Sequence, residues 1–212
     1  MDPKTLRLYL IVDADGRYDD LTDRVRAACS KGDVTLVQLR SKGLDARAQV
    51  DLTRDLARTL TVPVLVNDRV DIAFVAGAAG VHVGQTDIHP EDAHAIIGQS
   101  GLVGLTVRSV TEARAAPLGS LDYVSIGGVF STSTKSDAAE PIGLDGLREI
   151  AEVLKARDAR MPLCAIAGMT AERAGDVVRQ GVDGVCVASA ILGADDPAAA
   201  AAEIADAVRA AL

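Results

Sequence analysis

Aromatic residues are almost absent from this chain. Tryptophan does not occur, and Phe, Tyr and Trp together make up 2% of the 212 residues. Proteins that bind single-stranded nucleic acid stack its bases on aromatic side chains. The formal net charge of −8 also provides no positive field that would attract a polyanion. The composition therefore argues against binding to nucleic acid or to an anionic membrane, and any phosphate ligand needs a local basic cluster.

Long apolar runs and a cysteine framework are also missing. No run reaches the roughly 20 residues of a membrane span, and the N-terminal MDPKTLRLYL lacks the apolar core of a signal peptide. Cys29, Cys164 and Cys186 are odd in number and widely spaced, which fits neither a disulfide framework nor a metal site. We therefore expect free, buried thiols and a cytoplasmic protein.

The chain consists of short apolar runs that alternate with longer helical stretches. The runs are continuous and rich in β-branched residues, as in parallel strands that are covered on both faces. The expected strands span Leu6–Val12, Thr35–Leu39, Val62–Val66, Gly80–Val83, Leu102–Leu105, Tyr123–Ile126, Leu163–Ile166 and Gly184–Val187. The expected helices span Leu21–Lys31, Ala46–Leu60, Val70–Ala76, Pro90–Ile97, Thr111–Ala116, Leu144–Ala156, Ala171–Gln180 and Pro197–Leu212.

This alternation of strands and helices predicts an α/β fold, a (β/α)8 TIM barrel. A doubly wound sheet is the alternative architecture. No linker or shift in composition divides residues 1–212, so we expect a single catalytic domain. The segment Gly127–Gly143 is too long for a plain connection from strand to helix and is expected to be a functional lid.

Polar residues at the ends of the early strands are candidates for the active site, because barrel enzymes place it at the carboxyl ends of the strands. Gln38, Arg40 and Lys42 project to one side at period two and could grip phosphate oxygens, although a solvated strand end would look the same. Asp68 and Asp87 follow the third and fourth runs, where two carboxylates could converge on Mg²⁺. Each aspartate could instead cap the helix that follows it.

The ends of the later strands suggest a second anion site. The sixth loop is the segment Gly127–Gly143 after the sixth run, and in it paired glycines precede hydroxyl side chains and Lys135. This pattern is typical of an anion-binding loop but also of a polar surface loop. Gly168 and Ser189 follow the seventh and eighth runs, a position that often binds phosphate in barrels. His82 has no acidic partner nearby in the sequence, so we expect hydrogen bonds inside the barrel to satisfy it.

Taken together, these motifs resemble those of the thiamine phosphate synthase family. The matching stretches run in order from Gln38 to Ile191 and are VQLRSKG, VNDRVDIA, GVHVGQTD, DYVSIGGVFSTSTK, AIAGMT and GVDGVCVASAI. The resemblance implies a TIM-barrel transferase of thiamine biosynthesis that uses Mg²⁺. Such an enzyme displaces pyrophosphate from hydroxymethylpyrimidine diphosphate with the ring nitrogen of a thiazole monophosphate, and the diphosphate departs before the nitrogen attacks.

The resemblance also implies a role for each matching residue. Asp68 and Asp87 would hold Mg²⁺, and Lys135 would neutralise the departing pyrophosphate. The residues expected at the pyrimidine diphosphate are Gln38, Arg40, Lys42 and Asn67. Those expected to bind the thiazole phosphate are Thr132, Thr134, Gly168 and Ser189, with Ala188 beside them. Thr106 keeps the hydroxyl of the family's G-x-S-x-H stretch and is expected to bind substrate and to act in catalysis with Arg40 and Lys135.

The sequence departs from the family pattern at three points. Arg108 replaces the histidine of that stretch and could either alter the pyrimidine contacts or face solvent. The pair Gly127-Gly128 stands where the family usually has Gly-Pro before the Phe of the sixth loop. Ala167 stands where the family usually has the first glycine of a pair after the seventh strand.

Three other functions are compatible with parts of this pattern. A thiazole tautomerase of the same fold would not need the complete metal and diphosphate set. A phosphosugar isomerase would need an acid–base pair that we do not find. A non-catalytic sensor of thiamine intermediates would not need intact Asp68, Asp87 and Lys135. The sequence does not determine the oligomeric state, and a homodimer is compatible with it.

Overall fold

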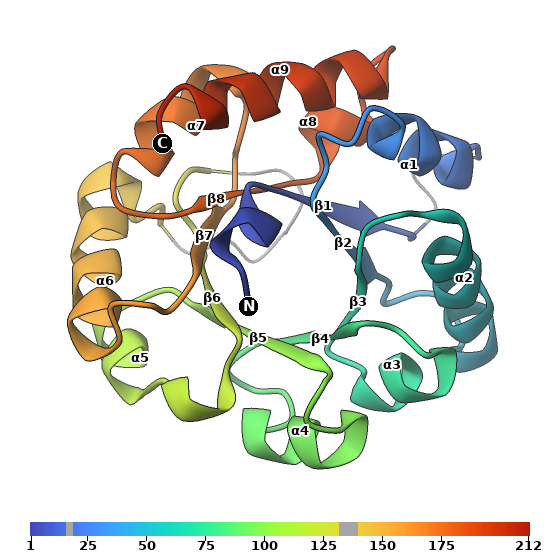
Figure 1. Ribbon diagram of the computed structural model, residues 1–212, viewed down its shortest axis with the longest axis horizontal. Helices are drawn as coiled ribbons and strands as arrows, with labels where there is room; N and C mark the ends of the chain where they lie inside the picture. Colours follow the sequence, from blue (N-terminus) through green and yellow to red (C-terminus); the bar gives the residue numbers. More distant parts are fainter. Residues whose placement is uncertain (16–18, 132–139) are drawn as a thin grey trace.

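Eight parallel strands close into a barrel in residues 1–15, 19–131 and 140–212, which are the residues that the computed structural model describes (Figure 1). Each strand pairs with the next along the chain, and β1 pairs with β8 through Leu8↔Val185 and Leu10↔Val187, which closes the barrel. The strands are β1 Leu8–Asp13, β2 Leu36–Arg40, β3 Val64–Asn67, β4 Gly80–Val83, β5 Leu102–Val107, β6 Tyr123–Ile126, β7 Leu163–Ile166 and β8 Gly184–Val187. The predicted TIM barrel is therefore confirmed, and the doubly wound sheet is excluded.

Helices form a ring around these strands (Figure 1). They are α1 Leu21–Cys29, α2 Ala46–Thr59, α3 Val70–Ala76, α4 Pro90–Ile97, α5 Val110–Ala115, α6 Gly143–Arg157, α7 Ala171–Val178, α8 Ser189–Leu192 and α9 Pro197–Arg209. Two 3₁₀ helices, η1 Pro3–Leu6 and η2 Leu118–Ser120, complete the described secondary structure. No helix in the described residues is long and apolar enough to cross a membrane.

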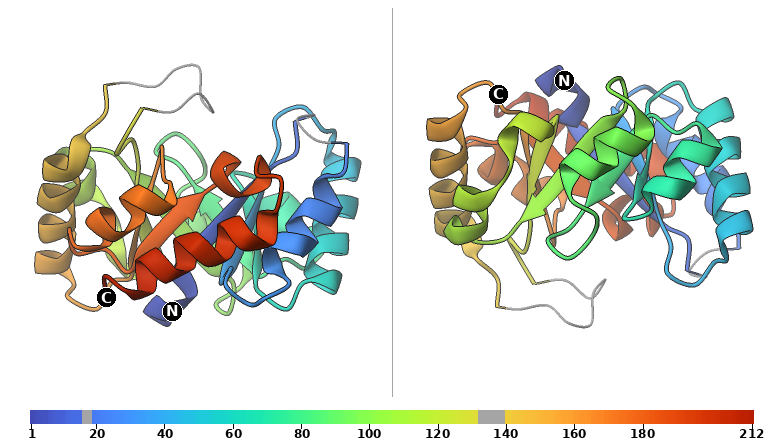
Figure 2. Two further views of the ribbon diagram at one scale, coloured as in Figure 1. Left: turned by 90° about the horizontal axis from the view of Figure 1, so that it is seen from above. Right: turned by 90° about the horizontal axis from the view of Figure 1, so that it is seen from below.

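The sequence-based prediction of secondary structure was wrong near both ends of the chain. The first strand begins at Leu8 instead of Leu6, because Pro3–Leu6 form η1, which Asp2 caps by accepting a hydrogen bond from the Lys4 N–H. η1 contacts β1, β7 and β8, and Figure 2 shows both termini at one end of the barrel. After β8 the chain first forms α8, which the prediction missed, and only then α9, capped by Asp196 through the Ala199 N–H.

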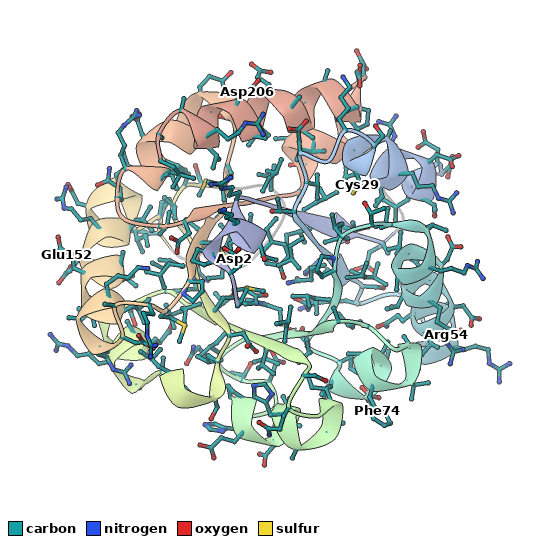
Figure 3. All side chains as sticks on the ribbon, in the orientation of Figure 1. Asp2, Cys29, Arg54, Phe74, Glu152 and Asp206 are labelled. Carbon is teal, nitrogen blue, oxygen red and sulfur yellow. The ribbon has the colours of Figure 1, made fainter. Side chains whose placement is uncertain are left out.

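Alternation along each strand separates two apolar regions. In β1, Leu8, Leu10 and Val12 pack outward against the helices, whereas Tyr9 and Ile11 belong to the cluster inside the barrel. Figure 3 shows the complementary outer surface, where Arg54 and Glu152 lie on the outer side of the helix ring. All the cysteines are free and buried, as expected, and burial raises the pKa of the Cys29 thiol to about 11.

A glycine inside the barrel makes room for a buried phenol. Gly104 on β5 is the register partner of Tyr123 on β6, and a Cβ at Gly104 would lie 2.1 Å from the Tyr123 Cζ. Because real Cβ contacts are much longer than this, Tyr123 can occupy the barrel interior only while residue 104 has no side chain. The glycine therefore has a packing role that does not depend on unusual backbone angles.

We expect Gly104→Ala to lower the free energy of unfolding by about 1–3 kcal/mol, because the added methyl displaces the Tyr123 ring. Urea denaturation measures this loss. Gly119→Ala is the matched control, since no atom lies within 4 Å of a Cβ built at Gly119. Equal stability of the two variants would contradict the packing role of Gly104.

Candidate active site

A pocket at the carboxyl end of the barrel receives residues from every strand or from the segment directly after it. Its lining residues are Tyr9, Ile11, Gln38, Arg40, Asn67, His82, Thr106, Arg108, Ser125, Gly127, Gly128, Phe130, Ile166, Ala167, Gly168, Met169, Cys186, Val187, Ala188, Ser189 and Ala190. The structure thus brings together seven of the predicted site residues: Gln38, Arg40, Asn67, Thr106, Gly168, Ala188 and Ser189. Thr132, Thr134 and Lys135 lie outside the described residues.

A chain of hydrogen bonds crosses the interior of the barrel below this pocket. The Gln38 Nε2 donates to the Tyr9 Oη at 2.5 Å, and the Tyr9 Oη lies 2.9 Å from the Tyr123 Oη. The Tyr123 Oη is 2.7 Å from the His82 Nδ1, and the His82 Nε2 is 2.7 Å from the Thr106 Oγ1. The chain therefore connects β2, β1, β6, β4 and β5 and confirms that His82 is satisfied inside the barrel.

Both tyrosines in this hydrogen-bond chain are protonated phenols. Burial raises the pKa of both Tyr9 and Tyr123 well above the ordinary value, so both phenols stay protonated and can donate. The Tyr9 Oη accepts from Gln38, and either phenol can donate in the contact between Tyr9 and Tyr123. The tautomer of His82 sets which ring nitrogen donates, so it also sets whether Thr106 donates to His82 or accepts from it.

Asp13 and Asp15, at the end of β1, hold the predicted phosphate-binding residues at the end of β2. The Asp13 Oδ2 lies 3.1 Å from the Arg40 Nη1, and both side chains are mostly buried. Asp15 accepts hydrogen bonds from the Ser41 hydroxyl at 2.7 Å and from the Lys42 N–H at 2.9 Å. Although partial burial opposes it, these bonds lower the pKa of Asp15. The Arg40 guanidinium and the Lys42 main chain are therefore held in place, and Arg40 reaches the pocket already paired with a carboxylate.

The two predicted carboxylates do converge. Burial, the charge of Asp87 and a hydrogen bond with Asp87 raise the pKa of Asp68 to about 6, whereas Lys42 and Asn67 act in the opposite direction. The Asp68 backbone has a left-handed φ of 63°, and the Asp87 Oδ2 accepts the Gly84 N–H at 2.7 Å. Arg69, not Asp68, occupies the N-cap of α3, and His89, not Asp87, caps α4. The alternative interpretation as helix caps is therefore wrong.

The ends of β7 and β8 form the opposite side of the pocket. Gly168 has a φ of 67°, and a Cβ there would lie 2.7 Å from the Phe130 Cβ and 2.8 Å from the Ser131 carbonyl oxygen. The Phe130 N–H donates to the Ala167 carbonyl at 3.2 Å, which ties the segment after β6 to the end of β7. Ser189 is the first residue of the short helix α8. This arrangement resembles the phosphate site that many barrels form after strands seven and eight.

Sequence reasoning missed Tyr9, Tyr123 and Asp13 as parts of the site. Tyr9 and Tyr123 lie within apolar runs, where a tyrosine is usually only a core residue. A signal existed in the alternation, since Tyr9 and Gln38 both occupy inward positions of adjacent paired strands. The pairing of Gly104 with Tyr123 depends on strand register, which the sequence alone does not provide.

Comparison with known proteins identifies the family. A sequence model described as thiamine monophosphate synthase matches residues 8–191. The chain belongs to this family. It is 41% identical over 201 residues to the thiamine-phosphate synthase of Chloroflexus aurantiacus, covering 93% of this chain and 90% of the relative. It is 42% identical over 197 residues to the thiamine-phosphate synthase of Clostridium novyi, covering 90% of this chain and 92% of the relative.

Solved structures agree with this family. Thiamine phosphate pyrophosphorylase from Pyrococcus furiosus superposes with a TM-score of 0.85 at 34% identity, covering 99% of this chain and 98% of that one. The 3-hexulose-6-phosphate synthase of Salmonella typhimurium has a TM-score of 0.76 at 17% identity, covering 98% and 100% of the two chains. The second likeness, at 17% identity, shows the barrel fold alone, whereas the first, at 34% identity, is to a thiamine phosphate pyrophosphorylase.

The carboxylate pair predicts how the stability of the metal-free protein depends on pH. Because the pKa of Asp68 is about 6 in the folded state against an ordinary value of 3.8, ionisation of this group disfavours folding. The cost is absent below about pH 4, grows as the pH rises and is complete above about pH 6. Asp68→Asn should therefore stabilise the protein by about 1 kcal/mol near pH 8, after allowance for solvent screening of this half-exposed group.

Thermal denaturation in the presence of a chelator measures the stability difference between Asp68→Asn and the unsubstituted protein near pH 4 and near pH 8. Asn tolerates the left-handed backbone of residue 68, so the substitution changes the charge with little added strain. Asp45→Asn, which keeps a cap on α2, controls for the general loss of one negative charge. A stabilisation by Asp68→Asn that is the same near pH 4 and pH 8 would contradict the raised pKa of Asp68.

Proposed function

We propose that this pocket joins hydroxymethylpyrimidine diphosphate to a thiazole monophosphate and releases pyrophosphate. Membership of the family makes the protein a transferase of thiamine phosphate synthesis. The observation that supports the two-substrate reaction is the composition of one pocket. Arg40 and Asn67 line its β2–β4 side, and Gly168 and Ser189 line its β7–β8 side. Asp68 and Asp87 do not line the pocket but follow β3 and β4 directly beside Asn67. This arrangement supports two separate places for phosphate groups. The buried free thiols support a cytoplasmic location.

Mg²⁺ fits the residues Asp68 and Asp87. Burial and the neighbouring charge of Asp87 both raise the pKa of Asp68, and a bound divalent cation would stabilise the ionised form of both carboxylates. The described residues contain no cluster of three or more His, Cys, Asp or Glu side chains that could hold a metal. A site with two carboxylates is typical of Mg²⁺ that takes its other ligands from water and substrate phosphates. When bound, Mg²⁺ would neutralise charge on the diphosphate oxygens.

The other residues of the early strands orient the diphosphate. Lys42 and Asn67 lie close enough to Asp68 to affect its pKa, so a diphosphate at the carboxylate pair is within their reach. Arg40 is held in place by Asp13 and provides a fork of N–H donors. Thr106 lines the pocket with its hydroxyl held 2.7 Å from the His82 Nε2, and it would contact the pyrimidine from there. Gln38 has its amide nitrogen on Tyr9, which leaves its carbonyl oxygen for the substrate.

The reaction needs charge stabilisation and orientation, and it needs no strong base. The C–O bond to the diphosphate breaks with both electrons leaving on oxygen, and the thiazole nitrogen then forms the new C–N bond with its lone pair. Because this nitrogen is neutral and carries no proton, nothing must be abstracted. Gly168, Ala188 and Ser189, together with Thr132 and Thr134 of the sixth loop, would hold the thiazole phosphate and so align the nucleophile.

Purified protein, both substrates and Mg²⁺ should therefore yield thiamine phosphate and pyrophosphate. Asp87→Asn should lower turnover at limiting Mg²⁺ by roughly tenfold or more, and added Mg²⁺ should restore part of it, because one of two metal ligands loses its charge. Thiamine phosphate is measured as fluorescent product after oxidation. Asp92→Asn on the exposed side of α4 is the control for a lost carboxylate. Normal Mg²⁺ dependence of Asp87→Asn would remove this residue from the metal site.

Lys135 is proposed to act on the leaving group from the sixth loop. The net charge of the protein is −8, so its overall field opposes a diphosphate that becomes a separate anion. A local cation that contacts the leaving oxygens as the bond breaks lowers the barrier without tightening substrate binding. Lys135→Ala should therefore reduce kcat by roughly a hundredfold or more and leave KM for the pyrimidine nearly unchanged.

Single-turnover kinetics at saturating substrates isolates this chemical step. Lys31→Ala, which removes an exposed lysine after α1, provides the control for lost positive charge. A chemical step within a few-fold of that of the unsubstituted protein would exclude Lys135 from the mechanism.

A further inference from the structure

Arg108 is an unusual cation in this pocket. Among the described residues that line the pocket, Arg40 and Arg108 carry guanidinium groups. Arg40 is paired with Asp13 at 3.1 Å. In contrast, the side chain of Arg108 has no hydrogen bond or ion pair with any residue in the described part of the chain, although it is half-buried. A partly desolvated charge without a partner is costly, and proteins usually pair such groups with a counter-ion.

The backbone of Arg108 is held firmly at the start of α5. The Arg108 N–H donates to the Glu112 Oε2 at 2.6 Å, and the Ser109 Oγ accepts the Glu112 N–H at 3.1 Å. This is a reciprocal cap in which a carboxylate returns to the backbone at the beginning of the helix. Glu112 thus binds the main chain of Arg108 and not its guanidinium. The backbone of Arg108 is therefore fixed, while its guanidinium can still bind a ligand.

Two glycines after β6 provide the surface on which Arg108 lies. A Cβ at Gly128 would lie 3.0 Å from the Arg108 Nη2 and 3.2 Å from the Nε, and a Cβ at Gly127 would lie 3.3 Å from the Arg108 Cγ. Gly128 has a φ of 79°, which no proline can adopt. Two departures from the family pattern, the arginine and the Gly-Gly pair, are therefore neighbours in space. The second leaves open the space beside the guanidinium of the first.

We propose that Arg108 binds a phosphoryl oxygen of a bound substrate. This proposal rests on the proposed function, which places two phosphorylated substrates in this pocket. A guanidinium presents paired N–H donors that match phosphate oxygens. Because the protein has a net charge of −8, an anionic ligand depends on cations within the pocket for its attraction. Arg108 lines the pocket just after β5, and in the barrel order β5 lies between the strands that precede the carboxylate pair and those that precede Gly168 and Ser189. The oxygen belongs either to the diphosphate of the pyrimidine or to the monophosphate of the thiazole.

Anion binding tests this assignment without requiring catalysis. The dissociation constants of pyrophosphate with Mg²⁺ and of inorganic phosphate are measured for the unsubstituted protein and for Arg108→Ala. We expect a loss of roughly ten- to a hundredfold for one of the two anions, as is typical for a hydrogen-bonded charge. Arg108→Lys keeps the charge without the fork of donors, so its dissociation constant for that anion should lie between those of the unsubstituted protein and Arg108→Ala. Arg114→Ala on the exposed side of α5 changes the net charge equally and should bind as the unsubstituted protein does.

The pattern of losses identifies the source of the oxygen. Weakened pyrophosphate binding with unchanged phosphate binding assigns Arg108 to the diphosphate, and the reverse assigns it to the monophosphate. Arg108→Ala that binds both anions as tightly as Arg114→Ala would overturn the proposal, as would failure of the unsubstituted protein to bind either anion. Thiamine phosphate formation by the unsubstituted protein is assayed in parallel, so that failure of the proposed function is recognised separately.

Discussion

The buried hydrogen-bond chain from Gln38 to Thr106 is the constraint on which the site depends. A barrel interior normally holds apolar side chains, and each polar atom placed there needs a partner. Here Tyr9, Tyr123 and His82 satisfy one another, and the ends of the chain reach the pocket at Gln38 and Thr106. The floor of the pocket is therefore rigid and directional. Loss of one phenol would leave two neighbours unsatisfied, so the effect would spread across several strands.

The site combines arginines with several carboxylates, and each carboxylate changes how strongly the site attracts an anion. The protein carries a net charge of −8, yet it must hold anionic substrates. Arg40 is positioned by Asp13, and this pairing reduces its cost of burial but also its net attraction for phosphate. The pair Asp68 and Asp87 adds further negative charge, which makes the pocket repel a diphosphate unless a divalent cation accompanies it. Metal and substrate binding are therefore expected to be coupled, and Arg108 contributes positive charge that no carboxylate in the described chain offsets.

The barrel and the carboxylate pair could be predicted from the sequence, because both follow from periodicity and from the position of residues after apolar runs. Leu6 continues an apolar run and is therefore predicted as part of a strand, but it is the last residue of the 3₁₀ helix that begins at Pro3. The chain through Tyr9 and Tyr123 could not be predicted, because hydrogen bonds across a barrel depend on register and on the space beside Gly104. Thr132, Thr134 and Lys135 stay predictions, since they lie outside the described residues.

Backbone conformation at the strand ends adds a last constraint. In the described part of the chain, Asp68 and Ala167 are the non-glycine residues with positive φ, at 63° and 96°. Both directly follow a strand that ends at the site: Asp68 belongs to the carboxylate pair, and Ala167 lines the pocket. Such conformations cost on the order of 1–3 kcal/mol each and persist only when surrounding contacts enforce them. For Asp68 the enforcing contact is its N–H on the His82 carbonyl at 2.8 Å, and for Ala167 its carbonyl accepts the Phe130 N–H at 3.2 Å. Each strained turn therefore depends on a neighbouring strand or loop, so closure of the barrel positions the reacting groups as well as the core.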